Sequence, residues 1–233
     1  EFLFGDESSL MGRGTAGGMA GAMLMRGTES RTRQEIQDEL DRLQAQGSIG
    51  GGPTIATGQF RTVRDNVPAV LELVADIVRN PSFRGFTHAT ATTAENLRYE
   101  YEGTELFWEM ERMLAGAYGR GRNPDAEFET FGRLPLDEVK AFHDTYYRPN
   151  NMALVLVGDI TADELAAVID RLVEGLAVDG PPLPEKTELA CGGGTTIVDF
   201  AVPQSVAIFG HAGMERDDPD YLEAYILSEI MGG

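Results

Sequence analysis

The stretch Gly14–Thr28, GTAGGMAGAMLMRGT, decides the fold that we expect of this 233-residue chain. Alanine, glycine and methionine dominate residues 15–26. Small side chains let a helix pack closely against a neighbouring element, although glycine weakens the helix itself. We therefore expect a helix here that depends on close packing for its stability.

Capping boxes predict where two further helices begin. Thr32 precedes Glu35 by three residues, and Thr161 precedes Glu164 in the same way, so that each pair can satisfy free backbone N–H groups. Apolar residues recur at helical spacing behind both boxes. The same periodicity predicts other helices, over residues 67–79, 93–102, 104–118, 136–147 and from Pro219 onward.

Strands are expected at four places between these helices. The glycine-rich stretch Gly47–Val63 is typical of a strand with a bulge or an open edge. The continuously apolar run Asn151–Val157 predicts a short strand that is central and buried. Two more strands are predicted over Thr195–Val202 and Ser205–Ala212. This order of elements indicates an α+β fold, a mostly antiparallel sheet with helices packed on one face.

The chain divides at a stretch rich in glycine and proline. We expect residues 1–179 to form an α+β domain, with its first strands missing, and residues 180–194 to form a linker. Residues 195–233 are too few to build a core of their own. They are interpreted as the beginning of a second, similar but incomplete α+β domain.

Composition excludes several classes of partner. The formal net charge of −19 repels nucleic acid and anionic lipid, and it favours basic peptides over acidic ones. No apolar run approaches the roughly 20 residues that span a membrane, and no targeting segment is apparent. Cys191 is the single cysteine, which excludes an internal disulfide. We expect a soluble protein of the bacterial cell envelope or cytoplasm rather than a secreted, disulfide-rich one.

The run Met23–Thr28, MLMRGT, resembles the segment that follows the zinc motif in the insulinase/pitrilysin family of zinc metallopeptidases. These are inverzincins, similar to the mitochondrial processing peptidase, and active members carry His-x-x-Glu-His directly before that segment. Here the two histidine positions fall on Gly18 and Ala22, and the catalytic glutamate position falls on Gly21. None of these three residues can bind a metal ion or accept a proton.

The likeness extends along most of the chain. Further matching segments are Arg31–Ile36, Phe142–Asp159 and Pro203–Tyr221. Proteins of this family are built from paired halves, and the resemblance implies a truncated, non-catalytic half. Such a half has no catalytic residue, metal ligand or cofactor of its own. We expect it to be inactive alone and to close a peptide chamber against a catalytic, zinc-bearing half or subunit.

Two alternatives stay open. The chain could be a structural assembly subunit of the same fold without a peptidase role. It could also be an active metallopeptidase with a displaced metal site, although His88, His143 and His211 are far apart in sequence. The resemblance places the third zinc ligand near Glu95 to Glu102, where Glu100 is also available. A metal site built from these residues has no complete ligand set.

The glycine-rich strand is the feature most able to retain a function. In active relatives the corresponding strand lies beside the zinc and pairs with the substrate backbone. A strand with few side chains can accept an extended peptide by β-augmentation, so candidate peptide-binding residues are Ile49, Gly50, Gly51, Gly52 and Thr54. The alternative is a bulged edge strand that only turns the sheet.

Two other motifs carry less weight. Gly12–Gly17 matches Gly-x-Gly-x-x-Gly, but a dinucleotide site needs a buried strand leading into it, and a polar segment precedes this one. A flexible lead into the helix is the preferred interpretation over a nucleotide-binding enzyme. Cys191 precedes three glycines and has no adjacent base, so we interpret it as an incidental thiol.

Overall fold

A computed structural model describes residues 1–6, 9–10, 12–101, 130–184, 194–195, 197, 207 and 214–232. The chain forms two compact units, Glu1–Glu185 and Lys186–Gly233. The first unit contains the strands β1 (Phe2–Leu3), β2 (Gln46–Gly51) and β3 (Ile55–Arg61), and the helices α1 (Gly14–Leu24), α2 (Arg33–Arg42), α3 (Val67–Arg79), α4 (Phe86–Tyr101), α7 (Leu136–Tyr146) and α8 (Ala162–Val173). The second unit contains α9 (Tyr221–Met231).

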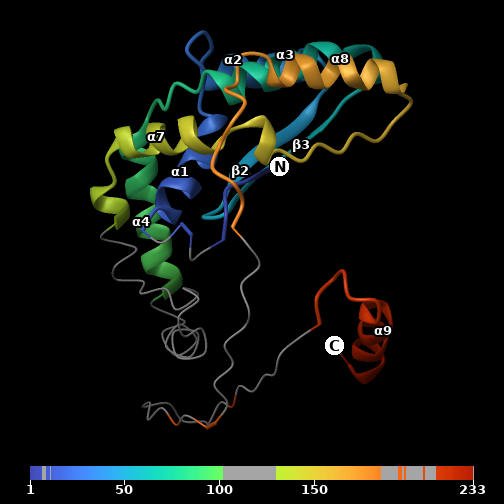
Figure 1. Cartoon of the computed structure of the whole chain (residues 1–233). Coiled ribbons are helices and arrows are strands. Elements are labelled where there is room, and N and C mark those ends of the chain that lie inside the picture. Colours follow the sequence, from blue (N-terminus) through green and yellow to red (C-terminus); the bar gives the residue numbers. More distant parts are fainter. Residues whose placement is uncertain are drawn as a thin grey trace. The chain divides into compact units, whose positions relative to one another are not determined.

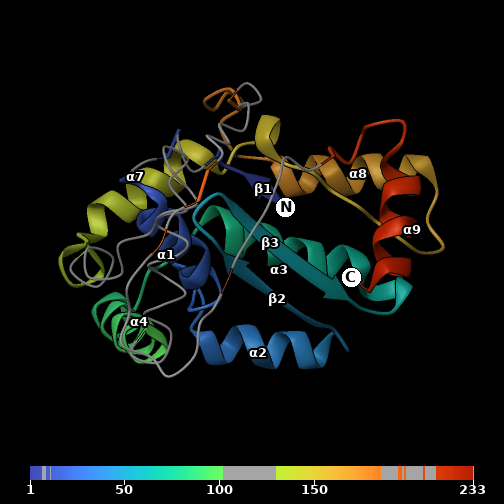
Figure 2. The same ribbon diagram turned by 90° about the horizontal axis from the view of Figure 1, so that it is seen from below.

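The sheet of the first unit is antiparallel, in the order β1-β3-β2. Helices α1 and α3 lie along one face of β2 and β3 (Figures 1 and 2). The expected α+β fold, with an antiparallel sheet and helices on one face, is therefore confirmed. The glycine-rich stretch is not one strand, however, but a hairpin that turns at Gly52-Pro53-Thr54, because proline and glycine favour a turn there.

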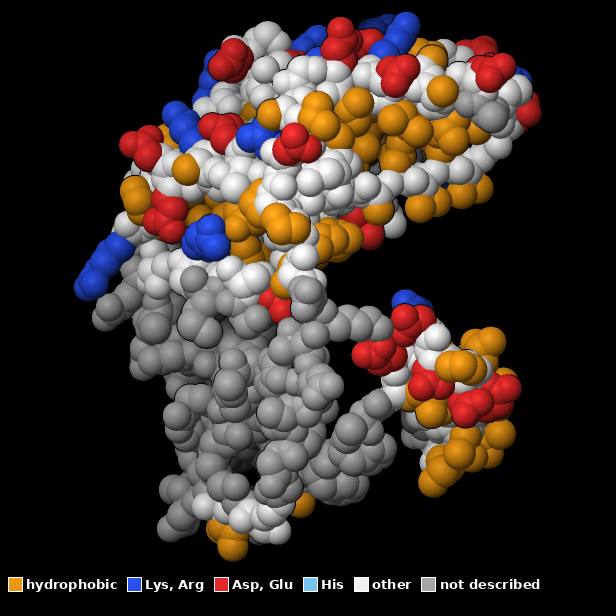
Figure 3. All heavy atoms as spheres, in the orientation of Figure 1, with side chains coloured by type: hydrophobic (Ala, Val, Ile, Leu, Met, Phe, Trp, Pro, Cys, Tyr) orange, Lys and Arg blue, Asp and Glu red, His pale blue; other side chains and the backbone are white. Residues whose placement is uncertain are grey.

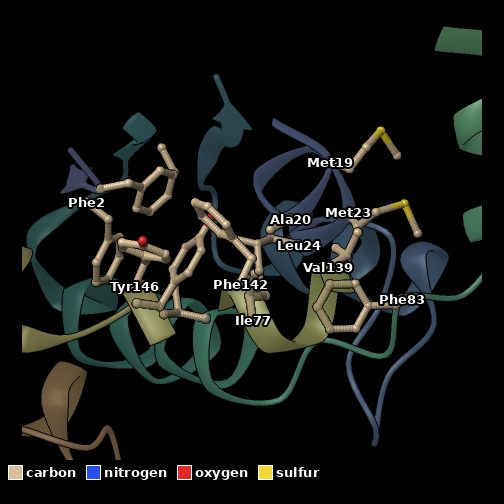
Figure 4. Close-up of a cluster of buried hydrophobic side chains, with 14 of the residues drawn as sticks. Phe2, Met19, Ala20, Met23, Leu24, Ile77, Phe83, Val139, Phe142 and Tyr146 are labelled. Atoms are coloured by element: carbon tan, nitrogen blue, oxygen red, sulfur yellow. The ribbon is translucent and has the colours of Figure 1, made fainter. Parts of the chain in front are cut away.

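The core forms where α1 packs against α7 and β3. Met23 and Leu24 of α1 and Val139 of α7 are fully buried, and Figure 4 shows them in one cluster with Phe142 and Ile77. Complete burial of one such side chain stabilises a fold by about 1.5–3 kcal/mol. Aromatic rings extend this cluster toward β1. The ring contacts are Phe4 edge-on to Phe142, Phe142 stacked on Tyr146, and Phe2 tilted against Tyr147.

Both predicted capping boxes are confirmed. The Glu35 amide donates to the hydroxyl of Thr32 at 3.2 Å, while the Thr32 amide donates to the Glu35 carboxylate at 2.7 Å. Thr161 and Glu164 make the same reciprocal pair at the start of α8, at 3.3 and 2.8 Å. Local sequence alone fixes these helix starts, since both partners lie within four residues.

Helix α4 begins earlier than the expected Thr93, at Phe86. Threonine hydroxyls inside the helix donate to carbonyl oxygens one turn back. Thr92 bonds to His88, and Thr93 bonds to Ala89. Threonine is a weak helix former, and these bonds satisfy its hydroxyl without breaking the helix. The helix expected over 104–118 lies outside the described residues.

The prediction of a central, buried strand over Asn151–Val157 is wrong. Pro149–Asn151 forms a 3-10 turn, and Met152 makes an isolated antiparallel bridge to Phe2. Beyond Ala153 the backbone has no β partner among the described residues. Val155 and Val157 are 84% and 93% exposed. A strand needs a neighbour on each side to be buried, and the apolar sequence alone does not supply one.

The second unit is described mainly by α9. Its apolar side chains are exposed, namely Leu222, Tyr225, Ile226, Leu227, Ile230 and Met231. Most residues of the two strands expected at 195–202 and 205–212 lie outside the described part of the chain. The domain division at 179 and 195 stays a prediction. No helix within the described ranges is both long and apolar enough to cross a membrane.

His143 ties α7 to α3 inside the core. Its Nε2 atom donates to the carbonyl oxygen of Val78 at 2.7 Å, and its ring stacks on Tyr147 with 4.6 Å between centroids. Burial lowers the pKa of this imidazole, and the bond to Val78 and the carboxylate of Asp144 only partly oppose that effect. The ring is therefore neutral at pH 7 and acts as a structural donor.

Stability should depend on pH through His143. The unfolded chain takes up a proton on this residue near pH 6.5, whereas the folded chain resists it until lower pH. The contribution of neutral His143 to the free energy of unfolding is therefore complete above about pH 6.5. It is lost progressively as the pH falls toward the pKa of His143 in the folded chain. Urea unfolding between pH 5 and 8 should show this loss, and His143→Gln should flatten it. An unchanged pH profile in the variant would contradict this assignment.

Candidate functional site

Gly21, to which the resemblance assigns the catalytic glutamate position, lies at a backbone contact between α1 and β2. A Cβ atom on Gly21 would lie 2.4 Å from the Cα of Gly51, and a Cβ on Gly51 would lie 2.6 Å from the Cα of Gly21. Neither distance is compatible with a side chain. The helix and the strand therefore meet backbone to backbone, as the small residues of α1 predict.

Gly18 and Ala22, to which the resemblance assigns the two histidine positions, have more space around them. A Cβ on Gly18 would have its nearest neighbour at 3.9 Å, the carbonyl carbon of Gly52, and Ala22 is exposed. Both positions have room for a side chain, but the carboxylate position between them has none. At Gly21, α1 therefore lies too close to β2 for a longer side chain.

The outer edge of β2 presents free backbone groups. The Gly52 amide donates to the carbonyl of Ile55 at 2.7 Å. Because bonded and non-bonded pairs alternate in an antiparallel ladder, Gly50 and Ser48 turn toward β3, and Ile49 and Gly51 turn outward. No described strand pairs with this outer edge. The register runs without interruption from Gln46 to Gly51, so the alternative of a bulge is wrong.

The candidate peptide-binding residues fall on two parts of the hairpin. Ile49, Gly50 and Gly51 lie in β2, and only the half-buried Ile49 carries a side chain. Gly52 and Thr54 lie in the turn, and the Thr54 carbonyl already accepts the amide of Phe4 at 2.9 Å. The structure thus brings the first three together on one open edge, while the backbone carbonyl of Thr54 is engaged elsewhere.

The remaining candidate ligands do not converge within the described ranges. His88 is exposed on α4, and His143 is in the core on α7. Glu95 is exposed on α4, whereas Glu102, Cys191 and His211 lie outside the described residues. Where the structure is described, no three residues of the types histidine, cysteine, aspartate or glutamate are placed to hold a metal ion.

The lead into α1 is a turn and not a strand. The Arg13 amide donates to the Leu10 carbonyl at 2.7 Å, and Gly12 has a φ of 77°. The Gly-x-Gly-x-x-Gly match therefore lacks the preceding strand that a dinucleotide site requires.

A polar cavity of about 530 Å³ was not predicted. It is lined by Arg79, Arg84 and Lys140 together with Glu29 and Asp144, and by five further residues. The lining comes from separate segments around the end of α3 and one side of α7. No local sequence signal marks such a site, and its charges of both signs indicate no particular ligand.

Comparisons with known proteins point to one family. Residues 133–233 match the family model described as the peptidase M16 inactive domain. An uncharacterized zinc protease of Rickettsia bellii is 25% identical over 91% of this chain and 52% of its own length. A second, of Rickettsia felis, is 22% identical with the same coverage. The chain thus spans about half the length of the curated relatives it matches.

Solved structures show the same fold. The peptidase M16 inactive domain from Pseudomonas fluorescens has a TM-score of 0.65 at 21% identity, over 80% of this chain and 46% of that one. Pitrilysin has a TM-score of 0.58 at 16% identity, over 80% and 21%. The first half of the periplasmic protease PqqL from Escherichia coli has a TM-score of 0.53 at 17% identity, over 80% and 43%.

Two glycine-to-alanine substitutions test the contact between α1 and β2. Gly21→Ala should lower the free energy of unfolding by about 1–3 kcal/mol, because its methyl group would clash with the backbone of Gly51. Gly18→Ala lies one turn away in open space and should raise stability by up to about 1 kcal/mol, since alanine favours the helix. Urea unfolding followed by circular dichroism measures both, and equal effects would contradict the close approach.

Proposed function

We propose that this chain, which is an M16-type, zinc-protease-like protein by sequence match and fold, serves as the non-catalytic half of a zinc metallopeptidase. The observation that carries the proposal is the backbone contact of Gly21 with Gly51, where a catalytic half would hold its glutamate. A helix packed this closely on the hairpin serves the fold and leaves no space for the zinc-activated water.

The partner in this proposal is a half or subunit that carries His-x-x-Glu-His and its zinc. Support comes from the two-part architecture of the neighbours, of which one is the first half of PqqL. The periplasmic location of PqqL makes the cell envelope a reasonable compartment for this chain too. In the assembled pair, the present half would form one wall of a chamber, and the partner would cleave the peptide bond.

Peptide contact in this half would take place at the outer edge of β2. The outward N–H and C=O groups of Ile49 and Gly51 can continue the sheet into an extended peptide. Glycines beside Ile49 remove side chains that would hold a peptide backbone away. The net charge of −19 would favour basic peptides over acidic ones.

Reconstitution tests the role of this half. The chain and a His-x-x-Glu-His protein encoded beside it should co-purify, and a fluorogenic peptide should be cleaved only by the mixture. Replacing the motif glutamate of the partner with glutamine should abolish cleavage without separating the two chains. Peptidase activity of this chain alone, with stoichiometric zinc, would instead establish a displaced metal site. A stable complex that is indifferent to peptides would favour the assembly role.

A substitution at Ile49 tests the edge strand. Ile49→Pro removes one outward N–H group without removing a bond to β3, and it should weaken binding of a fluorescein-labelled octapeptide of alternating lysine and valine. Loss of one hydrogen bond of about 1 kcal/mol corresponds to roughly fivefold in Kd. Ile49→Ala keeps the N–H group and controls for the lost side chain. Equal affinity of the two variants would remove this edge from the proposal.

A further inference from the structure

The connector that follows α8, residues 180–184, is tied to the end of α7 by two asparagine side chains. The Gly180 amide donates to Oδ1 of Asn150 at 3.2 Å, and Nδ2 of Asn150 donates to the Gly180 carbonyl at 3.3 Å. Asn151, which is buried, donates to the Pro181 carbonyl at 3.4 Å. In Figure 1, the orange segment after α8 passes beside the yellow turn at the end of α7. These three hydrogen bonds fix the start of the connector on the first unit.

The contact with α7 accommodates only glycine at position 180. A Cβ atom on Gly180 would lie 2.7 Å from Cγ of Arg148 and 3.3 Å from Oδ1 of Asn150. Arg148 is itself held in place, because its guanidinium donates to the carbonyl oxygens of Asp144 and Thr145 in the last turn of α7. The close approach of the connector to α7 therefore requires a residue without a side chain.

The residue before this glycine is Asp179, and the two form the one Asp-Gly pair in the sequence. Asp179 is exposed. Figure 3 shows acidic side chains at several places on the visible face of the first unit, so exposure alone does not distinguish Asp179 from other carboxylates. What distinguishes it is the glycine that follows, because an amide nitrogen without a neighbouring Cβ is the least hindered nucleophile that a backbone offers.

The chemistry open to an Asp-Gly pair is isomerisation of its peptide bond. The Gly180 nitrogen attacks Cγ of the protonated Asp179 side chain, and a C–N bond forms while the carboxyl hydroxyl leaves with the amide proton as water. The product is a cyclic succinimide. Water then adds to the former backbone carbonyl of Asp179 and breaks its bond to nitrogen, so that the chain runs through Cγ as isoaspartate. One water leaves and one enters, and no other reactant is needed.

The hydrogen bonds to Asn150 oppose the first step of this reaction. The nitrogen must come within about 3–3.5 Å of Cγ in an aligned geometry. That approach requires rotation of the peptide group between Asp179 and Gly180, whereas Asn150 holds this group by the N–H and the following carbonyl. The N–H that must lose its proton is also directed at Oδ1 of Asn150. The contact with Asn150 therefore has to open before the ring can close.

We propose that Asp179 and Gly180 form a modification site for isoaspartate, that Asn150 guards it, and that the modification releases the connector. Isoaspartate inserts one extra carbon into the backbone before Gly180. The N–H and carbonyl of Gly180 then no longer match the spacing of the Asn150 side chain, so the contact does not form again. Release lengthens the free chain before Lys186, where the second unit begins. The proposal does not depend on peptide binding at β2 or on a zinc-bearing partner.

The rate of isoaspartate formation in the full chain tests the guard. Isoaspartate is measured by methyl transfer from S-adenosylmethionine with an isoaspartyl methyltransferase and is located by peptide mapping. Asn150→Ala should raise the rate roughly fivefold, as expected for loss of a hydrogen bond of about 1 kcal/mol. Asn150→Asp is the matched control, because it keeps an acceptor for the Gly180 N–H, and its rate should stay near that of the wild type. Asp179→Glu should give no signal, since its longer side chain disfavours the ring.

A free peptide spanning residues 176–183, Leu-Ala-Val-Asp-Gly-Pro-Pro-Leu, gives the unguarded rate. The folded wild-type chain should isomerise at least about tenfold more slowly, because two hydrogen bonds must open first. This comparison needs no variant, so it stands even if Asn150→Ala lowers the unfolding midpoint. Equal rates in the chain and the peptide would overturn the guard, and so would equal acceleration by Asn150→Ala and Asn150→Asp.

Hydrogen exchange of the Gly180 amide tests the release of the connector. The amide should exchange slowly in fresh wild-type chain and at least about tenfold faster in chain that carries isoaspartate at position 179. Fresh Asn150→Ala should resemble the modified chain. Slow exchange that persists after modification would show that the connector stays bound, and it would overturn the release even where the guard is confirmed.

Discussion

The contact between the backbones of Gly21 and Gly51 sets the distance between α1 and the β2–β3 hairpin, and other features of the first unit depend on that distance. A helix this close to the sheet carries its core side chains, Met23 and Leu24, directly into the space shared with α7. Gly17 shows the same constraint on the neighbouring turn, since a Cβ there would lie 2.8 Å from the Phe142 ring. The small residues of α1 thus allow it to pack closely on two neighbouring elements.

The same close packing bears on residues 18–22, where the resemblance would place a zinc motif. Metal ligands and a general base need a gap between helix and strand in which an ion, a water molecule and a peptide can fit. Of the three positions that the resemblance assigns to the motif, Gly21 is the tightest, while Gly18 and Ala22 have space around them. The match to the M16 inactive domain covers residues 133–233, which do not include α1, so the two observations rest on different parts of the sequence.

Local signals explain what could be predicted from the sequence. Capping boxes, the apolar residues at helical spacing in α3 and the small residues of α1 are all local features of the sequence. Each of them predicted a helix that the structure contains. Predictions failed where the outcome depends on a distant partner. The run from Leu154 to Val157 is apolar enough for a strand, but only Glu1–Leu3 lies beside its start. The contact of Gly21 with Gly51 also joins distant segments, so the sequence indicated close packing without identifying the neighbour.

The outer edge of β2 is unpaired backbone on which glycine leaves few side chains, so the edge is selective for backbone and tolerant of sequence. In the proposed function, this property suits a peptide that must be held and then released, because hydrogen bonds between backbones hold a peptide without depending on its side chains.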